Sequence, residues 1–322
     1  MTRPISKAIQ LEQPRLGTRV TFATDDFFAA KERIIDPADP VFVEDKYDDH
    51  GKWMDGWESR RRRGPGHDYC VIRFGVPGVI HGFDVDTSHF TGNYPPEASI
   101  EACSSDREAP EDGWVELIPK TALAGNAHHY LDARGEQIWS HVRLHIYPDG
   151  GVARLRVFGE IRADFKGVDG FVDLAAVEHG GRAIACSDEH YGSMHNLTAP
   201  GRGVNMGDGW ETARRRGPGN DWVIIALGQP GVIERAEVDT AHFKGNYPDR
   251  VSLEAGVFEN DEQALLPESD WQTLLPEAKL KMDQQHYFDD VLQSIGEVSH
   301  VRVSIYPDGG ISRIRLFGQV HG

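Results

Sequence analysis

Two stretches of the chain carry the same acidic, aromatic and basic residues in the same order. DGWESRRRRGPGHDY begins at Asp55 and DGWETARRRGPGNDW begins at Asp208, and 11 of the 15 aligned positions are identical. Each stretch contains a glutamate, Glu58 or Glu211, ahead of three shared arginines. A guanidinium group offers a planar fork of donors that matches a carboxylate or a ureide. The pattern predicts either such a binding site or arginines that pair with the protein's own carboxylates.

A second pair of stretches supplies groups that can move protons. VDTSHFTGNYP from Val85 and VDTAHFKGNYP from Val238 are identical at 9 of 11 positions. Aspartate can orient or deprotonate a group, histidine exchanges protons near neutral pH, and asparagine can bind a urea-like amide. The same residues could instead cap turns in a structural loop. The candidate catalytic residues are Asp86, His89, Asp239, His242, Glu58 and Glu211, and the candidate substrate-binding residues are Arg62, Arg215, Asn93, Asn246, Tyr94 and Tyr247.

Metal-dependent and nucleophilic chemistry find less support in the spacing. Asp84, Asp86 and His89 could place ligands together, but the chain lacks a strong metal motif such as H-E-x-x-H. We therefore expect no cofactor, and a divalent metal remains an alternative. No serine occupies a G-x-S-x-G elbow, and none of the three cysteines recurs in both stretches of the chain.

These motifs recur because the chain contains two copies of one unit. A third block, HVRLHIYPDGGVARLRVFG from His141, matches HVRVSIYPDGGISRIRLFG from His300 at 13 of 19 positions. A weaker match joins ATDDFFA at Ala23 to CSDEHYG at Cys186. Two copies of about 150 residues are typical of tandem domains and not of a solenoid. We place the domains at residues 1–165 and 166–322, with a polar, glycine-bearing junction between them.

Within each copy the hydrophobic pattern predicts β-strands. Val142, Leu144 and Ile146 alternate with polar residues, YPDGG can form a turn, and the alternation resumes at Leu155 and Val157, which predicts a hairpin. Short apolar runs separated by glycine and proline are typical of a sandwich or jelly roll. Helices should be few, with residues 276–288 the best candidate. We predict an all-β fold of two tandem jelly-roll, galactose-binding-like β-sandwich domains.

Composition restricts the partners and the compartment. The net charge of −17 argues against broad binding to nucleic acid or to an anionic membrane, because both would be repelled. An odd count of three cysteines without paired spacing favours a reducing compartment. The sequence shows neither an apolar leader nor a stretch long enough for a membrane span. We expect a cytoplasmic protein.

The repeated motifs resemble those of a known family. DGWESRRRR, VDTSHFTGNYPP and HVRLHIYPDGG, with their counterparts in the second copy, resemble the allantoicase (allantoate amidinohydrolase) family over nearly the whole chain. The resemblance implies hydrolysis of allantoate to ureidoglycolate and urea by a cytoplasmic homo-oligomer. An arginine such as Arg62 would then hold the substrate's carboxylate, Asn93 a ureido group, and a pair such as His89 with Asp86 would move protons.

The second copy departs from the first inside these motifs. It has Ala213, Asn220 and Ala241 where the first has Arg60, His67 and Ser88. Two separate sites and one composite site are therefore both open. A non-catalytic jelly-roll module that binds carbohydrate or another small polar ligand is the alternative function, and a duplicated scaffold is a further one, because a fold does not determine a function.

Overall fold

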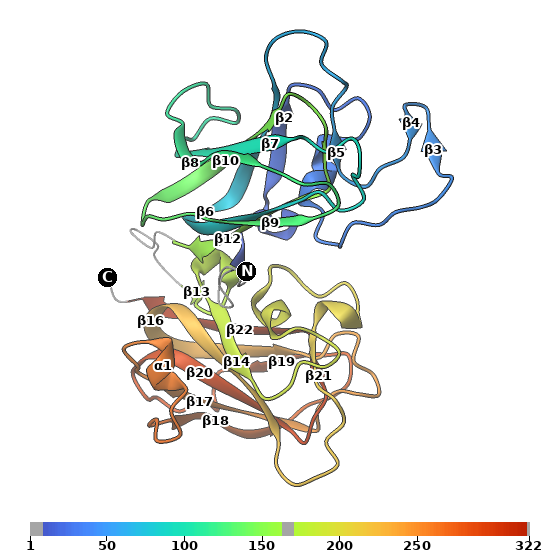
Figure 1. Cartoon of the computed structure of the whole chain (residues 1–322). Helices are drawn as coiled ribbons and strands as arrows, with labels where there is room; N and C mark the ends of the chain where they lie inside the picture. The colour runs from blue at the N-terminus through green and yellow to red at the C-terminus, as the bar shows by residue number, and fades with distance from the viewer. Residues whose placement is uncertain (1–8, 163–170, 321–322) are drawn as a thin grey trace. The chain divides into compact units, whose positions relative to one another are not determined.

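The computed structural model describes residues 9–162 and 171–320 (Figure 1). The chain divides into two compact units, Met1–Arg162 and Ala163–Gly322. The predicted boundary between residues 165 and 166 lies outside the described residues. Both units consist mainly of antiparallel β-strands, so the predicted all-β class is confirmed.

The first unit joins its strands through loops and two short 3₁₀ helices, η1 (Pro14–Leu16) and η2 (Lys31–Ile35). Its strands are β1 (Ile9–Gln10), β2 (Arg19–Ala23), β3 (Tyr47–Asp48), β4 (Gly51–Lys52), β5 (Trp57–Glu58), β6 (Asp68–Asp86), β7 (Glu97–Cys103), β8 (Val115–Ala122), β9 (His128–Asp132), β10 (Ile138–Tyr147), β11 (Gly151–Val152) and β12 (Arg154–Ile161).

The second unit repeats this order without counterparts of β3 and β4 among its described residues. Its strands are β13 (Val172–Asp173), β14 (Arg182–Cys186), β15 (Trp210–Glu211), β16 (Asp221–Asp239), β17 (Arg250–Gly256), β18 (Gln272–Lys279), β19 (Gln285–Phe288), β20 (Glu297–Tyr306), β21 (Gly310–Ile311) and β22 (Arg313–Val320). Its helices are η3 (Val177–His179), η4 (Met194–Thr198), η5 (Met206–Asp208) and α1 (Asp261–Ala264). The helix expected over residues 276–288 is wrong, because this segment pairs with β17 and β16 as parts of β18 and β19.

One long strand organises each unit. The first part of β6 pairs with β10 and β2, and its last part pairs with β12 and β9. The register with β10 shifts between Arg73 and Gly78, where β6 passes from one group of neighbours to the other. β16 does the same in the second unit, with β20 and β14 first and β22 and β19 afterwards. The long strand therefore connects the two groups of strands in each unit.

The hairpin expected around YPDGG is wrong. Both predicted strands exist, as β10 and β12, but each pairs with β6 and not with the other, and β12 is buried on both faces and does not alternate. Between them, Gly151 and Val152 form β11, which pairs with Glu58 and Trp57 of β5. The turn therefore carries the chain between the two groups of strands and holds the DGWE segment beside it.

A buried tryptophan fixes the DGWE segment in each unit. Trp57 and Trp210 are fully buried in the apolar core. Each indole N–H donates to a backbone carbonyl, that of Asp25 or that of Asp188, at 2.8 Å. Because burial of a large aromatic side chain is strongly stabilising, the residue that follows each tryptophan is held in a defined position.

Candidate functional site

The DGWE segment places two side chains in the packed interior and one in the wall of a cavity. Asp55 forms an ion pair with the buried Arg154 at 2.9 Å, and Trp57 lies in the core. Glu58, in contrast, lines a cavity of about 660 Å³. The second repeat divides these roles in the same way. The motif therefore recurs largely because it holds the frame together.

Glu58 and Asn93 meet in the wall of this cavity. The Asn93 side-chain N–H donates to Glu58 Oε1 at 2.8 Å, which joins two of the predicted site residues. Burial raises the pKa of the Glu58 carboxyl above its ordinary value, while the hydrogen bond from Asn93 lowers it. Asn246 donates to Glu211 in the second repeat in the same way.

Basic groups share the first cavity with the Glu58–Asn93 pair. His89 lines it from the loop that follows β6. His50 and Lys52 line it from the β3–β4 hairpin, and Phe42 adds an apolar wall. The cavity thus combines a half-buried acid, two imidazoles and an ammonium group, which are groups suited to acid–base chemistry on an anionic substrate.

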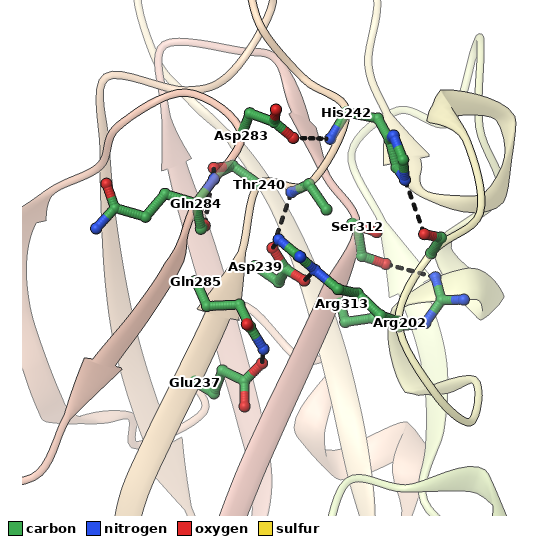
Figure 2. A network of polar contacts seen from close by, with 12 residues as sticks. Arg202, Glu237, Asp239, Thr240, His242, Asp283, Gln284, Gln285, Ser312 and Arg313 are labelled. Carbon is green, nitrogen blue, oxygen red and sulfur yellow. Dashed lines mark hydrogen bonds and ion pairs between the residues drawn. The ribbon is translucent and has the colours of Figure 1, made fainter.

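The contacts of His89 determine which of its ring nitrogens carries the hydrogen. Its φ is +69°, and its backbone N–H donates to Asn126 Oδ1 at 2.9 Å. Its Nε2 lies 3.1 Å from the carbonyl oxygen of Pro40. Because a carbonyl oxygen only accepts, Nε2 carries the hydrogen and Nδ1 is the basic nitrogen of the neutral ring. His242 has the same φ region, with Asp283 and the Gly203 carbonyl as partners (Figure 2).

The predicted pair of His89 with Asp86 is not present among the described contacts. Asp86 is 2% exposed, and its Oδ1 accepts the Ser88 N–H at 2.8 Å. The histidine beside these carboxylates is His128, whose Nδ1 lies 2.8 Å from Asp84 Oδ2. The aspartate of the motif therefore stabilises the turn that carries His89.

The second repeat replaces this histidine–carboxylate contact with other pairs. Arg202 Nε donates to Asp239 at 2.8 Å, and Gln285 Nε2 donates to Glu237 at 2.8 Å (Figure 2). His242 donates its Nε2 hydrogen to a backbone carbonyl instead of contacting Asp239. Asp86 and Asp239 are thus both buried, and each accepts a backbone N–H two residues further along the chain.

The middle one of the three shared arginines forms contacts within the protein in each repeat. The Arg62 guanidinium lies 2.6 Å from Asp68 Oδ1, and the Arg62 backbone N–H donates to Asp149 at 2.7 Å. Arg215 makes the corresponding ion pair with Asp221. Of the two interpretations of the arginine run, pairing with the protein's own carboxylates fits these two residues.

The second repeat has a cavity of about 590 Å³ around Glu211 and Asn246. Its walls contain Arg214, Arg215 and Tyr247, so it extends along the basic run. No histidine or lysine is among the described residues that line it. The first-repeat counterpart of this tyrosine, the predicted ligand residue Tyr94, is not among the described residues that line the first cavity, although both tyrosines pack against apolar clusters.

A difference in chain length explains why the two cavities differ. The N–H of Val41 and the N–H of Val204 make equivalent hydrogen bonds, to Asp55 at 2.9 Å and to Asp208 at 3.1 Å. These partners are 14 residues apart in the first repeat and 4 apart in the second, so the first has 14 − 4 = 10 additional residues. The addition contains β3 and β4 and brings His50 and Lys52 to the cavity.

The motifs did not identify His50, Lys52 or His128, because none of these residues recurs in the second copy. A usable signal existed in the spacing. The segments that begin at Ala23 and Cys186 are 163 residues apart, whereas the DGWE segments are 153 apart. The loop between them therefore had to be longer in the first copy.

Several other chemistries find no arrangement to support them in the described part of the chain. No group of three or more His, Cys, Asp or Glu side chains there could hold a metal ion. Burial raises the pKa of Cys103 and of Cys186 to about 11, so these thiols stay protonated near neutral pH. No described helix is long and apolar enough to cross a membrane.

The family model for the allantoicase repeat matches residues 9–162 and again residues 172–321. The chain belongs to the allantoicase family. The probable allantoicase of Ralstonia nicotianae is 55% identical over 314 residues, which cover 96% of this chain and 94% of that protein. Probable allantoicase 1 of Burkholderia mallei is 54% identical over 316 residues, with the same two coverages.

A solved structure from this family has the same fold. The crystal structure of allantoicase from Saccharomyces cerevisiae matches with a TM-score of 0.82 at 36% identity, over 98% of this chain and 95% of that chain. The resemblance to the allantoicase family and the prediction of two tandem β-sandwich domains are therefore confirmed.

Proposed function

We propose that hydrolysis of allantoate to ureidoglycolate and urea takes place in the cavity of the first repeat. Family membership supports this reaction. The observation that supports this location is the Glu58–Asn93 pair in one cavity with His89, His50 and Lys52. The second cavity has the acid–amide pair but no imidazole among its described walls.

The reaction replaces a ureido group by a hydroxyl group. Allantoate has one carbon that carries a carboxylate and two ureido groups. One C–N bond of this carbon must break and a C–O bond to water must form. The departing urea nitrogen gains a proton, and the water loses one. An acid on the leaving-group side and a base on the water side are therefore required.

Glu58 is suited to be the acid. Its pKa is raised by burial, so a larger fraction of its carboxyl groups carries a proton than in a solvated glutamate. Asn93, which donates to the same carboxyl, would position a ureido group through its amide. In this proposal Glu58 donates its proton to the nitrogen that leaves as urea.

His89 is suited to be the base. Its Nε2 hydrogen is directed to the Pro40 carbonyl, which leaves Nδ1 as the nitrogen that accepts a proton from water. Lys52, on the hairpin, would pair with the substrate's carboxylate in the place assigned to Arg62 from the sequence. The proton taken by His89 returns to Glu58 through solvent, so one water is consumed in each cycle.

The remaining predicted residues take supporting roles in this proposal. Asp86 holds the turn that presents His89. Arg62 holds the segment after DGWE through Asp68 and Asp149. Tyr94 packs against the apolar cluster of Met54, Phe90 and Ala153. A cytoplasmic homo-oligomer remains a prediction that follows from the family.

Paired glutamate variants test this location. Glu58→Gln removes the proton donor and keeps the side-chain shape, so we expect kcat/KM for urea release from allantoate to fall by about 10²–10⁴-fold. Glu211→Gln is the matched control in the second repeat, and it should change kcat/KM by less than about threefold. Melting temperatures of both variants separate chemistry from folding.

Other outcomes for these two variants would contradict the proposed location of the reaction. Loss of turnover in Glu211→Gln alone would place catalysis in the second repeat, and full activity in both variants would exclude the glutamates from the chemistry. Absence of urea release by the wild-type protein would favour the binding-module alternative.

A further inference from the structure

The second cavity contains a cation without a described partner. Arg214 is exposed in its wall and forms no ion pair among the described contacts. Two of the acidic residues that line this cavity are engaged elsewhere. Asp249 pairs with Lys279 at 2.5 Å, and Asp308 accepts the Arg215 backbone N–H at 2.9 Å. Arg214 is therefore the group available to an anion from solvent.

The acid–amide pair adds a second element of recognition. Asn246 uses its side-chain N–H on Glu211, which leaves its carbonyl oxygen to accept a hydrogen bond. The second carboxylate oxygen of Glu211 is a further acceptor. Two acceptors beside a guanidinium fork match a small molecule with N–H donors at one end and a carboxylate at the other.

The two repeats present their cations from different segments. The first-repeat counterpart of Arg214 is Arg61, which is not among the described residues that line the first cavity. The cation of that cavity is Lys52, from the ten additional residues. The second cavity therefore has its own ligand geometry and is not a copy of the first.

We propose that the second cavity is a separate, non-catalytic binding site for small carboxylates that carry a ureido or amide group. Arg214 pairs with the carboxylate, and the Glu211–Asn246 pair binds the ureido end. The non-catalytic assignment rests on the proposed function of the first repeat, whereas the binding itself does not. Each chain then holds two ligands of one chemical class, only one of which is turned over.

Calorimetric titration of the full chain with ureidoacetate tests the binding. This probe has a carboxylate and one ureido group but no second ureido group to expel. We expect two molecules bound per wild-type chain. Arg214→Gln should weaken one of these sites by about tenfold to a hundredfold, the usual loss for a charge-assisted contact. Lys52→Gln should weaken the other site.

Matched variants separate this effect from charge and folding. Arg216→Gln removes the same charge from an exposed neighbour outside the cavity wall and should leave both sites intact. Arg214→Lys keeps the charge without the fork, and a loss smaller than that of Arg214→Gln is expected. Urea release from allantoate by Arg214→Gln should stay within about twofold of wild type.

Each contrary result has one meaning. A single wild-type site that only Lys52→Gln weakens would overturn the proposal, as would Arg214→Gln binding two molecules with wild-type affinity. If Arg214→Gln lost ureidoacetate binding together with urea release, the binding site would stand and its non-catalytic role would be overturned. Glu58→Gln with full activity would then refute the location proposed for the reaction as well.

Discussion

Glu58 and Glu211 occupy the same place in two sandwiches, each following a buried tryptophan and each accepting from an asparagine. The space in front of them differs. The first cavity reaches the β3–β4 hairpin and two histidines, and the second reaches the arginine run. The acid–amide pair and the groups that hold the sandwich together are therefore alike in the two repeats, while the cations in the cavity walls, Lys52 and Arg214, come from different segments.

This difference changes how the internal duplication should be interpreted. Recurrence identifies a frame, because ion pairs such as Arg62 with Asp68 are needed wherever the same fold is built. Recurrence is a weaker indicator of catalytic residues, since the two cavities need not have the same function. His50 and Lys52 illustrate this, because the described part of the second repeat has no equivalent of the hairpin that carries them.

The largest effect expected within this comparison concerns the two loop histidines. His89 lines the first cavity, whereas His242 is not among the described residues that line the second. His89→Asn should lower kcat by about 10²–10⁴-fold through loss of the base. His242→Asn should leave kcat within about threefold. Asparagine tolerates the positive φ of both positions, so neither exchange should strain the backbone.

Steady-state urea release, with melting temperatures alongside, measures this contrast. Equal losses of kcat in the two variants would mean that both repeats contribute to one reaction. A large drop in melting temperature for His89→Asn without a change in kcat would make the ring's contact with Pro40 a packing feature only.

A smaller effect, on stability, concerns one buried carboxyl group in each repeat. Glu12 accepts the Val157 N–H at 2.9 Å, and Asp173 accepts the Leu316 N–H at 2.9 Å. Burial raises the pKa of Glu12 to about 7, against a lowering by Val157 and Arg156. The stability that protonated Glu12 contributes to the folded state is thus complete below about pH 4.5, and it is lost as the pH rises through 7.

Glu12→Gln keeps a neutral group at all pH values and should remove this dependence. Relative to the variant, wild type should lose about 3 kcal/mol of unfolding free energy between pH 4.5 and pH 8. Urea denaturation measures the loss, and hydrogen exchange over residues 154–161 assigns it to the first repeat. Asp173→Asn should act in the same direction, since burial also raises the pKa of Asp173. A wild-type protein that gained stability relative to Glu12→Gln over this range would refute the assignment.

The parts of this fold that sequence predicted well are those governed by local pattern. The alternation of Val142, Leu144 and Ile146 identified β10, and the repeated blocks identified the two domains. The pairing of β10 was mispredicted, because its partner β6 is distant in the chain and a turn signal says nothing of that choice. The sequence also could not predict which arginine forms an internal ion pair, since the Arg62–Asp68 contact depends on where the loop folds back.

The smallest contrast expected is between His128 and its counterpart Gln285, which meet Asp84 and Glu237. Burial lowers the pKa of His128, but the hydrogen bond and charge of Asp84, with Asp86 and Asp39 nearby, outweigh it and raise this pKa. A raised histidine pKa gives stability that is complete at low pH and lost as pH rises through the folded-state value. The second repeat has no such titration at this position, because glutamine stays neutral.

His128→Gln should therefore convert the first repeat to the pH behaviour of the second. Because the His128 side chain is 49% exposed, solvent screens the pair, and wild type should exceed the variant by only a few tenths of a kcal/mol at pH 5.5. The gap should close towards pH 8.5, as the folded-state imidazole loses its proton. Melting temperatures of both proteins at the two pH values measure it, and salt near 1 M should reduce the acidic gap further. A gap that widened towards pH 8.5 would show that neutral His128 packs better than glutamine, so that its charge is not what distinguishes the two repeats here.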